Sequence, residues 1–167
     1  MITLRAPEPS DLDFLFALES ADACGEGSFA SAPVSRQMLW DYLQNYDADI
    51  FAAKQLRLIA IDRDGGQRVG AVDIYDFDPR NRRGFVGIAI AEAFRGRGYG
   101  KAALEALCSY ASSTLGIHQL AAVVAEDNTP SRALFSSCAF RGCGRLRSWL
   151  RRGSQYADAI IFQRLFC

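Results

Sequence analysis

The 167-residue sequence predicts a mixed α+β fold with a mostly antiparallel sheet, one parallel strand–helix–strand crossover in the middle and a closing hairpin. Apolar residues recur at helical spacing over residues 98–115, between the apolar runs 85–91 and 119–125. Turn residues rather than helices separate the other apolar runs, which is typical of antiparallel strands. Hydrophobic residues make up 50% and no linker or repeat interrupts them, so we expect one domain over residues 1–167.

The first third of the chain is expected to hold a strand and two helices. Residues 2–4 form a short strand, and Ser10 is placed to cap the first helix, whose Leu15 faces inward. A passage rich in glycine, serine and alanine, residues 24–33, predicts a loop. Ser35 then precedes a second helix with apolar residues at helical spacing.

The remaining elements are mostly strands. Runs 56–61 and 69–77 flank an Asp-Gly-Gly turn and predict a hairpin, because these turn residues tolerate positive φ. The run 85–91 is apolar without alternation, which predicts a central strand buried on both faces. Gly116 ends the long helix, and the elements expected after it are a strand at 119–125, a short helix at 128–135 and closing strands at 140–150 and 155–166.

Composition argues against several classes of protein. No apolar stretch reaches the ~18 residues that a membrane helix needs, and the first residues lack the basic and apolar regions of a secretory signal. One histidine and no CxxC pair argue against a metal site, and an odd number of scattered cysteines argues against a disulfide framework. We therefore expect a cytoplasmic protein with reduced thiols and no membrane partner. The cysteines are Cys24, Cys108, Cys138, Cys143 and Cys167.

The net charge of +0 conceals an asymmetry between the two halves of the chain. Residues 1–78 hold 14 acids and 6 bases, whereas residues 79–167 hold 5 acids and 13 bases. Such opposite potentials favour an anion bound by the second half and a cation bound by the first. Two solvated faces that attract each other explain the asymmetry equally well.

The strongest local motif is Arg-Gly-Arg-Gly-Tyr-Gly-Lys at residues 95–101, between the central strand and the long helix. Glycines let the main chain approach a ligand closely, and the N–H groups at a helix start bind anions. The three basic side chains add positive charge at the same place. The motif therefore predicts a ligand that carries phosphate groups.

Other readings of this motif are weaker. Arg95 and Ala102 break the Walker pattern GxxxxGK(S/T), which argues against a nucleoside triphosphatase. Gly98, Gly100 and Ala103 satisfy GxGxxA, so a dinucleotide site stays open as an alternative, as does a turn without a ligand. The zero net charge and the lack of a basic stripe interleaved with aromatics argue against nucleic acid.

With its surroundings, this motif resembles the GNAT superfamily of acetyl-CoA-dependent N-acetyltransferases. Residues 95–100 fit the family pattern Q/R-x-x-G-x-G/A, and residues 153–160 are similar to the branch that holds spermidine and ribosomal-protein N-terminal acetyltransferases. The order of elements fits from residue 2 onward. The resemblance implies a single GNAT-like domain that transfers an acetyl group to an amine. The other matching segments are 87–90, 102–107, 126–135 and 138–140.

The resemblance also places the cosubstrate. The pyrophosphate of acetyl-CoA would lie on the turn amides, and the pantetheine arm would pair with the central strand where that strand splays from 119–125. Asn128 is expected to contact pantetheine, although asparagine before Thr-Pro is also a good helix cap. The residues expected to contact acetyl-CoA are Ile88, Ala89, Ile90, Arg95, Gly96, Arg97, Gly98, Tyr99, Gly100, Lys101, Asn128 and Ser131.

In this family the amine attacks the thioester directly, without a covalent enzyme intermediate. The backbone N–H of Ala89 or Ile90 is expected to stabilise the oxyanion. Asp73 matches the position of a glutamate in the polyamine branch, so we expect it to act as the base, through water; strand alternation puts it on the face opposite Asp76. Glu26 is a second candidate for contact with the amine.

Phe135 departs from the family pattern, because many relatives carry a tyrosine there whose hydroxyl protonates the leaving thiolate. Water, Ser136 or Tyr99 would substitute, or the thiolate leaves unassisted, since the pKa of a free thiol is near ~8.5. Cys138 is interpreted as a core residue. We therefore predict an N-acetyltransferase for a polyamine-like cation or a protein N-terminus, with a catalytically weak or inactive acetyl-CoA-binding module as the alternative. Aromatic residues of the closing hairpin, such as Trp149, favour a homodimer.

Overall fold

A computed structural model describes residues 2–23 and 33–166 of the chain. The strands are β1 (Ile2–Arg5), β2 (Leu56–Asp62), β3 (Arg68–Asp78), β4 (Arg83–Ile90), β5 (Gln119–Ala125), β6 (Arg141–Arg152) and β7 (Gln155–Leu165). The helices are α1 (Leu12–Ala23), α2 (Arg36–Gln44), α3 (Ile50–Ala53), α4 (Tyr99–Ser113) and α5 (Thr129–Ser137), with short 3-10 turns at Pro9–Asp11 and Glu92–Phe94.

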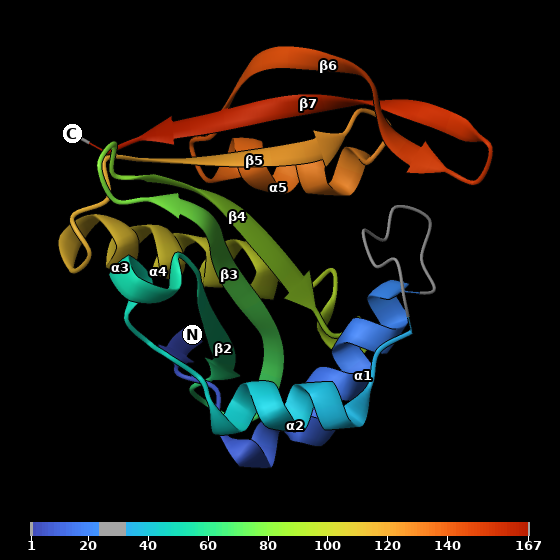
Figure 1. Ribbon diagram of the computed structural model, residues 1–167. Helices are drawn as coiled ribbons and strands as arrows, with labels where there is room; N and C mark the ends of the chain where they lie inside the picture. The colour runs from blue at the N-terminus through green and yellow to red at the C-terminus, as the bar shows by residue number, and fades with distance from the viewer. Residues whose placement is uncertain (1, 24–32, 167) are drawn as a thin grey trace.

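The strands form a seven-stranded mixed sheet in the order β1-β2-β3-β4-β5-β7-β6 (Figure 1). Strands β4 and β5 are parallel and α4 connects them, whereas the other neighbouring strands pair antiparallel. Strands β6 and β7 form the closing hairpin. The predicted α+β fold with its central crossover is therefore confirmed.

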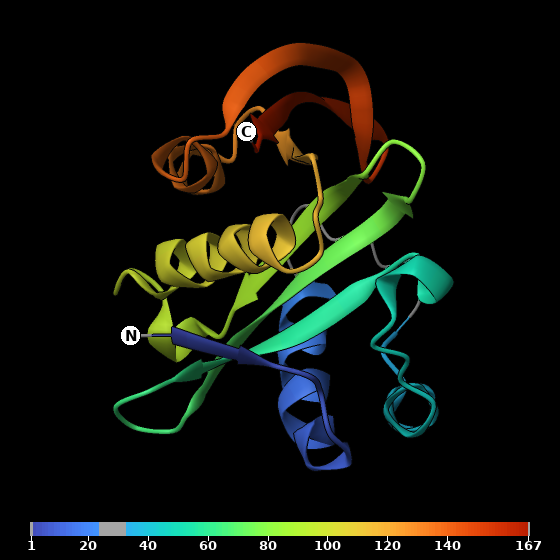
Figure 2. The same ribbon diagram turned by 90° about the vertical axis from the view of Figure 1, so that its left-hand side faces the viewer.

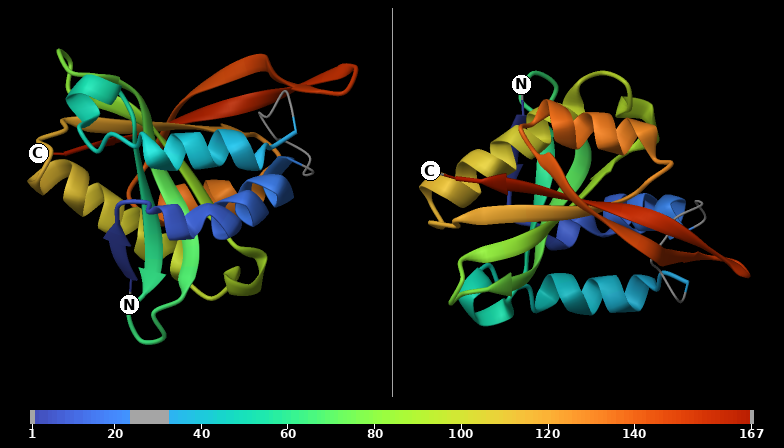
Figure 3. Two further views of the ribbon diagram at one scale, coloured as in Figure 1. Left: turned by 60° about the horizontal axis from the view of Figure 1, so that its bottom comes forward. Right: turned by 90° about the horizontal axis from the view of Figure 1, so that it is seen from above.

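The two faces of the sheet carry different helices (Figure 2). On one face, Leu104 and Leu107 of α4 pack with Val72 of the sheet. On the other face, Leu15 of α1 lies in a second core cluster with Ile59 of β2 and residues of α2. Burying one leucine side chain contributes about 1.5–3 kcal/mol, so this packing holds the helices in place. Seen from above, α4 and α5 lie on one side of the sheet and α1 and α2 on the other (Figure 3).

Strands β4 and β5 separate after a short pairing. Their paired residues run from Arg83 with Gln119 to Phe85 with Ala121; beyond that point β4 stays paired with β3, and β5 with β7. The sequence predicts that residues 85–91 are buried on both faces, and this is wrong for the second half of the strand. Residues 87–90 are half-buried, because β5 has turned away from this end of β4.

Two local predictions also need correction. Helix α3 is absent from the predicted elements, since its four residues are too few to show helical spacing. Ser10 does not cap the first helix. The chain enters α1 through a 3-10 turn whose cap is Glu8, because Pro9 suits the first helical position. The carboxylate of Asp11 accepts the backbone N–H of Glu8 at 2.7 Å.

Asp11 is fully buried and joins three parts of the fold. Its carboxylate accepts hydrogen bonds from Arg5 of β1 at 2.7 Å and from Arg68 of β3 at 2.5 Å. Burial alone would raise the pKa of Asp11, but Arg5, the Glu8 N–H and Arg68 together lower that pKa to about 2. The ionised carboxylate therefore holds the first strand and turn against the sheet.

Asp11→Asn is expected to lower the free energy of unfolding by about 3 kcal/mol near neutral pH, because it removes the buried charge that pairs with two half-buried arginines. A carboxyl whose folded pKa lies below its unfolded value stabilises the fold above pH ~4 and loses this effect toward pH ~2. The difference in unfolding free energy between wild type and Asp11→Asn, measured by urea unfolding, should therefore become smaller as the pH falls from ~4 to ~2. Asp13→Asn removes an exposed ion pair with Arg36 and should cost under about 1 kcal/mol. Equal losses for the two variants would contradict this account.

Within residues 2–23 and 33–166, no helix is long and apolar enough to span a membrane; α4, for example, has 15 residues. The same residues contain no cluster of three or more His, Cys, Asp or Glu side chains arranged to hold a metal ion.

Candidate active site

The turn between β4 and α4 presents main-chain amides. Gly96 has φ +71° and Gly98 has φ +83°, conformations that glycine adopts without strain. Gly98 is the N-cap of α4, and no side chain in the described chain caps that helix start. A Cβ atom at either glycine would have no described heavy atom within 4 Å. The first amides of α4, which no described side chain caps, therefore suit an anionic group, with Lys101 adding positive charge on the first helical turn.

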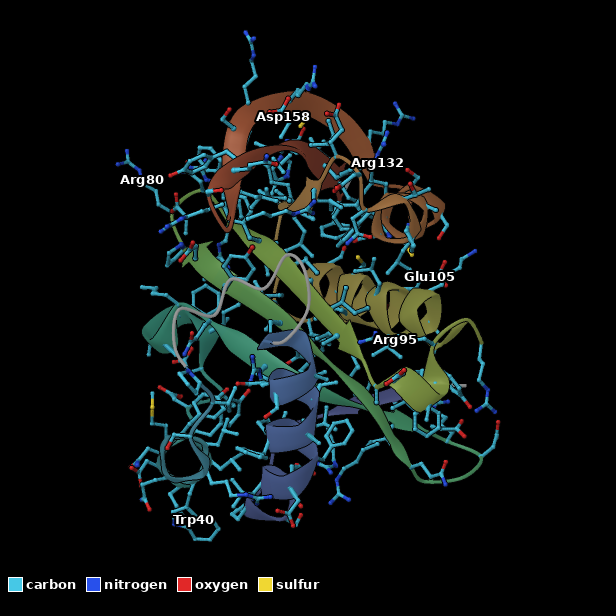
Figure 4. All side chains as sticks on the ribbon, turned by 90° about the vertical axis from the view of Figure 1, so that its right-hand side faces the viewer. Trp40, Arg80, Arg95, Glu105, Arg132 and Asp158 are labelled. Carbon is cyan, nitrogen blue, oxygen red and sulfur yellow. The ribbon has the colours of Figure 1, made fainter. Side chains whose placement is uncertain are left out.

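Two arginines shape this turn. The Nε of Arg95 donates to the carbonyl oxygen of Ile90 at 2.8 Å, which ties the turn to the end of β4. Figure 4 shows Arg95 where β4 meets the segment that leads into α4. The guanidinium of Arg97 lies over the rings of Phe94 and Tyr99, at 5.8 and 5.7 Å from their centroids. Both arginines therefore place positive charge next to the helix start.

The end of β4 directs alternate amides into the gap beside β5. The N–H of Ala91 donates to the carbonyl of Val69 on β3 at 2.9 Å. Because strand amides alternate in direction, the N–H of Ala89 also points to β3, and the N–H groups of Ile88 and Ile90 point into the gap. The sequence left Ala89 and Ile90 open as oxyanion donors, and this alternation favours Ile90.

Helix α5 lies across the gap from β4. The Oδ1 of Asn128 accepts the backbone N–H of Ser131 at 3.1 Å, which confirms that Asn128 is a helix cap. A side chain at Gly100 would begin 3.6 Å from Leu134 of α5 and 3.7 Å from Ile90 of β4. These are ordinary contact distances, so the start of α4 lies against both the end of β4 and α5. The elements that hold the residues expected to contact acetyl-CoA therefore lie next to one another, and the contacts themselves stay a prediction.

Asp73 lies on the α1 face of the sheet, opposite Arg57 on β2 and Gly87 on β4. The Nε of Arg57 donates to Oδ1 of Asp73 at 2.7 Å, and its Nη2 donates to Oδ2 at 3.3 Å. The Nη1 of Arg57 donates to Glu19 of α1. We call Glu19, Arg57 and Asp73 the Arg57 cluster. Each of its side chains is a quarter to a third exposed.

Burial and charge act against each other in the Arg57 cluster. Burial raises the pKa of Asp73; Arg57 opposes this rise, and Glu19 adds to it. Burial acts to lower the pKa of Arg57, but Asp73 and Glu19 outweigh it, so that pKa is raised. Burial also raises the pKa of the nearby Tyr42 to about 12. With both carboxylates ionised, the cluster carries one net negative charge.

A family model described as an acetyltransferase (GNAT) domain matches residues 1–141. The chain belongs to the GNAT acetyltransferase family. YdaF of Bacillus subtilis (strain 168), provisionally named a ribosomal N-acetyltransferase, is 27% identical over 172 residues, which cover 98% of this chain and 91% of YdaF. YokL, an N-acetyltransferase of the same organism, is 25% identical over 96% of this chain and 88% of its own.

The fold is also similar to that of solved acetyltransferases. The spermidine N-acetyltransferase of Vibrio cholerae, solved in complex with CoA and spermine, superposes with a TM-score of 0.87 at 22% identity, over 98% of this chain and 95% of that chain. This likeness confirms the GNAT fold. Membership in the family overturns the dinucleotide-site alternative that Gly98, Gly100 and Ala103 left open.

The GNAT acetyltransferase carries no hydroxyl at residue 135. Phe135 is buried against Phe140 and Phe162, with ring centroids 5.1 and 6.2 Å away. Ser136 lines a hollow between α5 and the closing hairpin instead of the gap beside β4. Cys138 is buried, and burial raises the pKa of its thiol, which confirms its place in the core.

Glu26 and two carboxylates that follow Asp73 on the chain have different outcomes. Glu26 lies outside the described residues. Asp76 is exposed at a bulge, with φ +49°. Asp78 accepts backbone N–H groups of the turn after β3, at 3.0 Å. Arg57 was missed by sequence reasoning, because the register that sets it across from Asp73 depends on a bulge between Ala60 and Ile61.

Gly87 leaves space beside the Arg57 cluster in this acetyltransferase. A Cβ at Gly87 would lie 3.5 Å from both Cβ and Oδ2 of Asp73, an ordinary contact distance. Gly87→Ala should therefore fold, and it should gain up to about 0.5–1 kcal/mol, because glycine weakens a strand interior. Turnover with an amine should fall several-fold, since the methyl group narrows the approach to Oδ2. Thermal unfolding and steady-state kinetics check this; unchanged turnover would show that the amine approaches elsewhere.

Proposed function

We propose that this acetyltransferase moves the acetyl group of acetyl-CoA directly to a primary amine, with both substrates bound together. The observation that carries the proposal is the opened edge of β4. Beyond Phe85 this edge diverges from β5, and it leads into a turn and a helix start that no described side chain caps. An extended pantetheine arm with its own amides fits a strand edge, and a diphosphate fits a helix start.

The proposed contacts to acetyl-CoA follow from this arrangement. Pantetheine would pair with the main chain of Ile88 and Ile90, and Asn128 with Ser131 would contact it from α5. The diphosphate would lie on residues 95–101. The N–H of Ile90 is the proposed oxyanion donor, because a fixed amide stabilises negative charge without reorganising.

The reaction needs a proton acceptor for the amine. The amine nitrogen forms a bond to the thioester carbonyl carbon, the carbon–sulfur bond breaks, and the nitrogen loses its proton to Asp73, directly or through water. Holding the two reactants together contributes about 7–11 kcal/mol. The thiolate leaves without help from Phe135, since the pKa of a free thiol is near ~8.5.

The proposed acceptor is a cationic amine, either a polyamine-like small molecule or a protein N-terminus. The net negative charge of the Arg57 cluster and the 14 acids against 6 bases in residues 1–78 support a cation. The Vibrio cholerae neighbour was solved with spermine, and the name of YdaF refers to the ribosome, so each class has support.

We further propose a cytoplasmic location and a homodimer. The described cysteines Cys108, Cys138 and Cys143 are free thiols, which fit a reducing compartment. Trp149 and Tyr156 of the closing hairpin are 57% and 61% exposed, which fits an interface between two copies. Light scattering during gel filtration tests the dimer.

The test of function is release of CoA thiol from acetyl-CoA in the presence of single amines. The panel would hold spermidine, spermine, a monoamine and peptides with free and blocked N-termini. Amine-dependent release with acetylated product in the mass spectrum is the expected result. CoA binding without turnover on any amine would favour the second candidate, an acetyl-CoA-binding module, for which Phe135 is the specific observation.

A further inference from the structure

We propose that Arg57 is a positioning residue for the acetyl transfer: it fixes the Asp73 carboxylate in one orientation and keeps it ionised, ready to take the proton of the amine. The inference rests on the proposed function. It concerns a side chain of β2, on the sheet face that carries α1 and away from the acetyl-CoA turn.

The geometry of Arg57 suits this role. Its Nε and Nη2 each donate to a different oxygen of Asp73, and such a two-point contact from a planar group fixes the plane of the carboxylate. Glu19 accepts a hydrogen bond from the remaining side of the guanidinium. The ring of Tyr42 lies 5.8 Å from Arg57, and the hydroxyl of Tyr46 donates to the Arg57 carbonyl at 2.6 Å. Arg57 is thus held by groups from several elements.

The same geometry leaves Asp73 able to accept another hydrogen bond. Each carboxylate oxygen has two acceptor positions, and Arg57 occupies one on each. A Cβ atom at Gly87 would lie 3.5 Å from Oδ2. Because Gly87 has no side chain, β4 does not cover Oδ2 at this position. An amine or a bridging water reaching the α1 face of β4 would meet this oxygen.

The charges around Asp73 explain why its ionisation depends on Arg57. The titratable groups that face it in the described chain are Arg57 of β2, Glu19 of α1, Tyr42 and Tyr46 from α2 and its end, and Tyr75 of β3. Among these groups Arg57 is the cation. Burial and Glu19 both raise the pKa of Asp73, and Arg57 opposes them. Without Arg57, Asp73 would hold its proton to higher pH and could act as a base only above that pH.

The test compares Arg57→Gln and Arg57→Lys with wild type in the pH dependence of kcat/KM for amine acetylation. In Arg57→Gln we expect the acid limb to move up by at least about one pH unit, the usual spread of carboxyl pKa values in proteins, with activity recovering at high pH. Arg57→Lys keeps the charge and should recover part of the shift. Arg36→Gln, which removes an arginine from an exposed pair with Asp13, is the control and should leave the profile unchanged.

A second readout needs no turnover. Carbon-13 NMR titration of the aspartate carboxyls, with Asp73→Asn to assign the signal, should show a higher pKa for Asp73 in Arg57→Gln than in wild type. An unchanged titration, or a loss of activity that is equal at every pH, would overturn the proposal and leave Arg57 a structural role.

The outcomes also separate this inference from the proposed function. If wild type acetylates no amine, the proposed function fails and the catalytic role of Arg57 fails with it, whatever the titration shows. If wild type is active but Asp73→Asn keeps the wild-type acid limb, acetyl transfer stands, and the roles of Asp73 and Arg57 are overturned.

Discussion

Asp73→Asn is expected to lower kcat with an amine by about 10²- to 10⁴-fold, the usual contribution of a general base. Asparagine has the shape of aspartate and still accepts one of the two hydrogen bonds from Arg57, but it cannot take a proton. Affinity for CoA should stay close to that of wild type, because Asp73 lies on the α1 face, whereas the turn at residues 95–101 begins α4. Steady-state kinetics and titration calorimetry measure the two quantities.

The matched control for this variant is Asp76→Asn. Asp76 lies on the same strand, exposed at a bulge. Its substitution should leave both kcat and CoA affinity nearly unchanged. Equal loss of turnover and of CoA affinity in Asp73→Asn would argue for a structural role and against a base at this position.

Gly98→Val is expected to weaken CoA binding by at least about tenfold, which corresponds to losing about 1.4 kcal/mol. At φ +83° a β-branched residue is strained, so the turn should relax and withdraw amides from the diphosphate. One hydrogen bond to a charged group contributes about 1.5–3 kcal/mol, so the loss of a single amide is enough to produce this effect. Titration calorimetry with CoA gives the measurement.

Gly116→Val provides the control at the other end of the same helix. Gly116 has φ +61°, and a Cβ there would also have no described atom within 4 Å, so the backbone strain is comparable. This variant should lose similar thermal stability and keep wild-type affinity for CoA. Equal weakening of CoA binding by both variants would mean that general destabilisation, not the turn at Gly98, is responsible.

Most of the fold could be predicted from the sequence because the strong signals are local. The apolar stripe of the long helix, the Asp-Gly-Gly turn and the glycine-rich motif each depend on a few neighbouring residues. The same holds for the turn at residues 95–101, where glycines at positive φ and basic residues stand together. The burial predicted for residues 85–91 was wrong because it depends on a distant part of the chain. Residues 87–90 are half-buried since β5 diverges from this end of β4.

The Arg57 cluster shows why a site that depends on register is hard to predict. Next to the turn between β2 and β3, Ile61 pairs with Arg68. A β-bulge between Ala60 and Ile61 then shifts the register by one residue, so that Ala60 pairs with Gly70 and not with Val69. Counting back from the turn without this bulge would set Arg57 against Val72, on the face of α4. The bulge brings Arg57 opposite Asp73 instead. No residue type near the bulge predicts this change of register.

Because β4 and β5 pair over a short stretch, a ligand bound between them should raise the thermal stability of the protein. Three residue pairs join the backbone of β4 to that of β5, and the core beneath α4 supplies the other contacts between the two parts of the sheet. A pantetheine arm bound in this opening would contact both strands and hold them together. Because a ligand that binds the folded state stabilises it in proportion to the logarithm of its concentration, the melting temperature should climb with added CoA. Hydrogen exchange should slow most along the facing edges of β4 and β5.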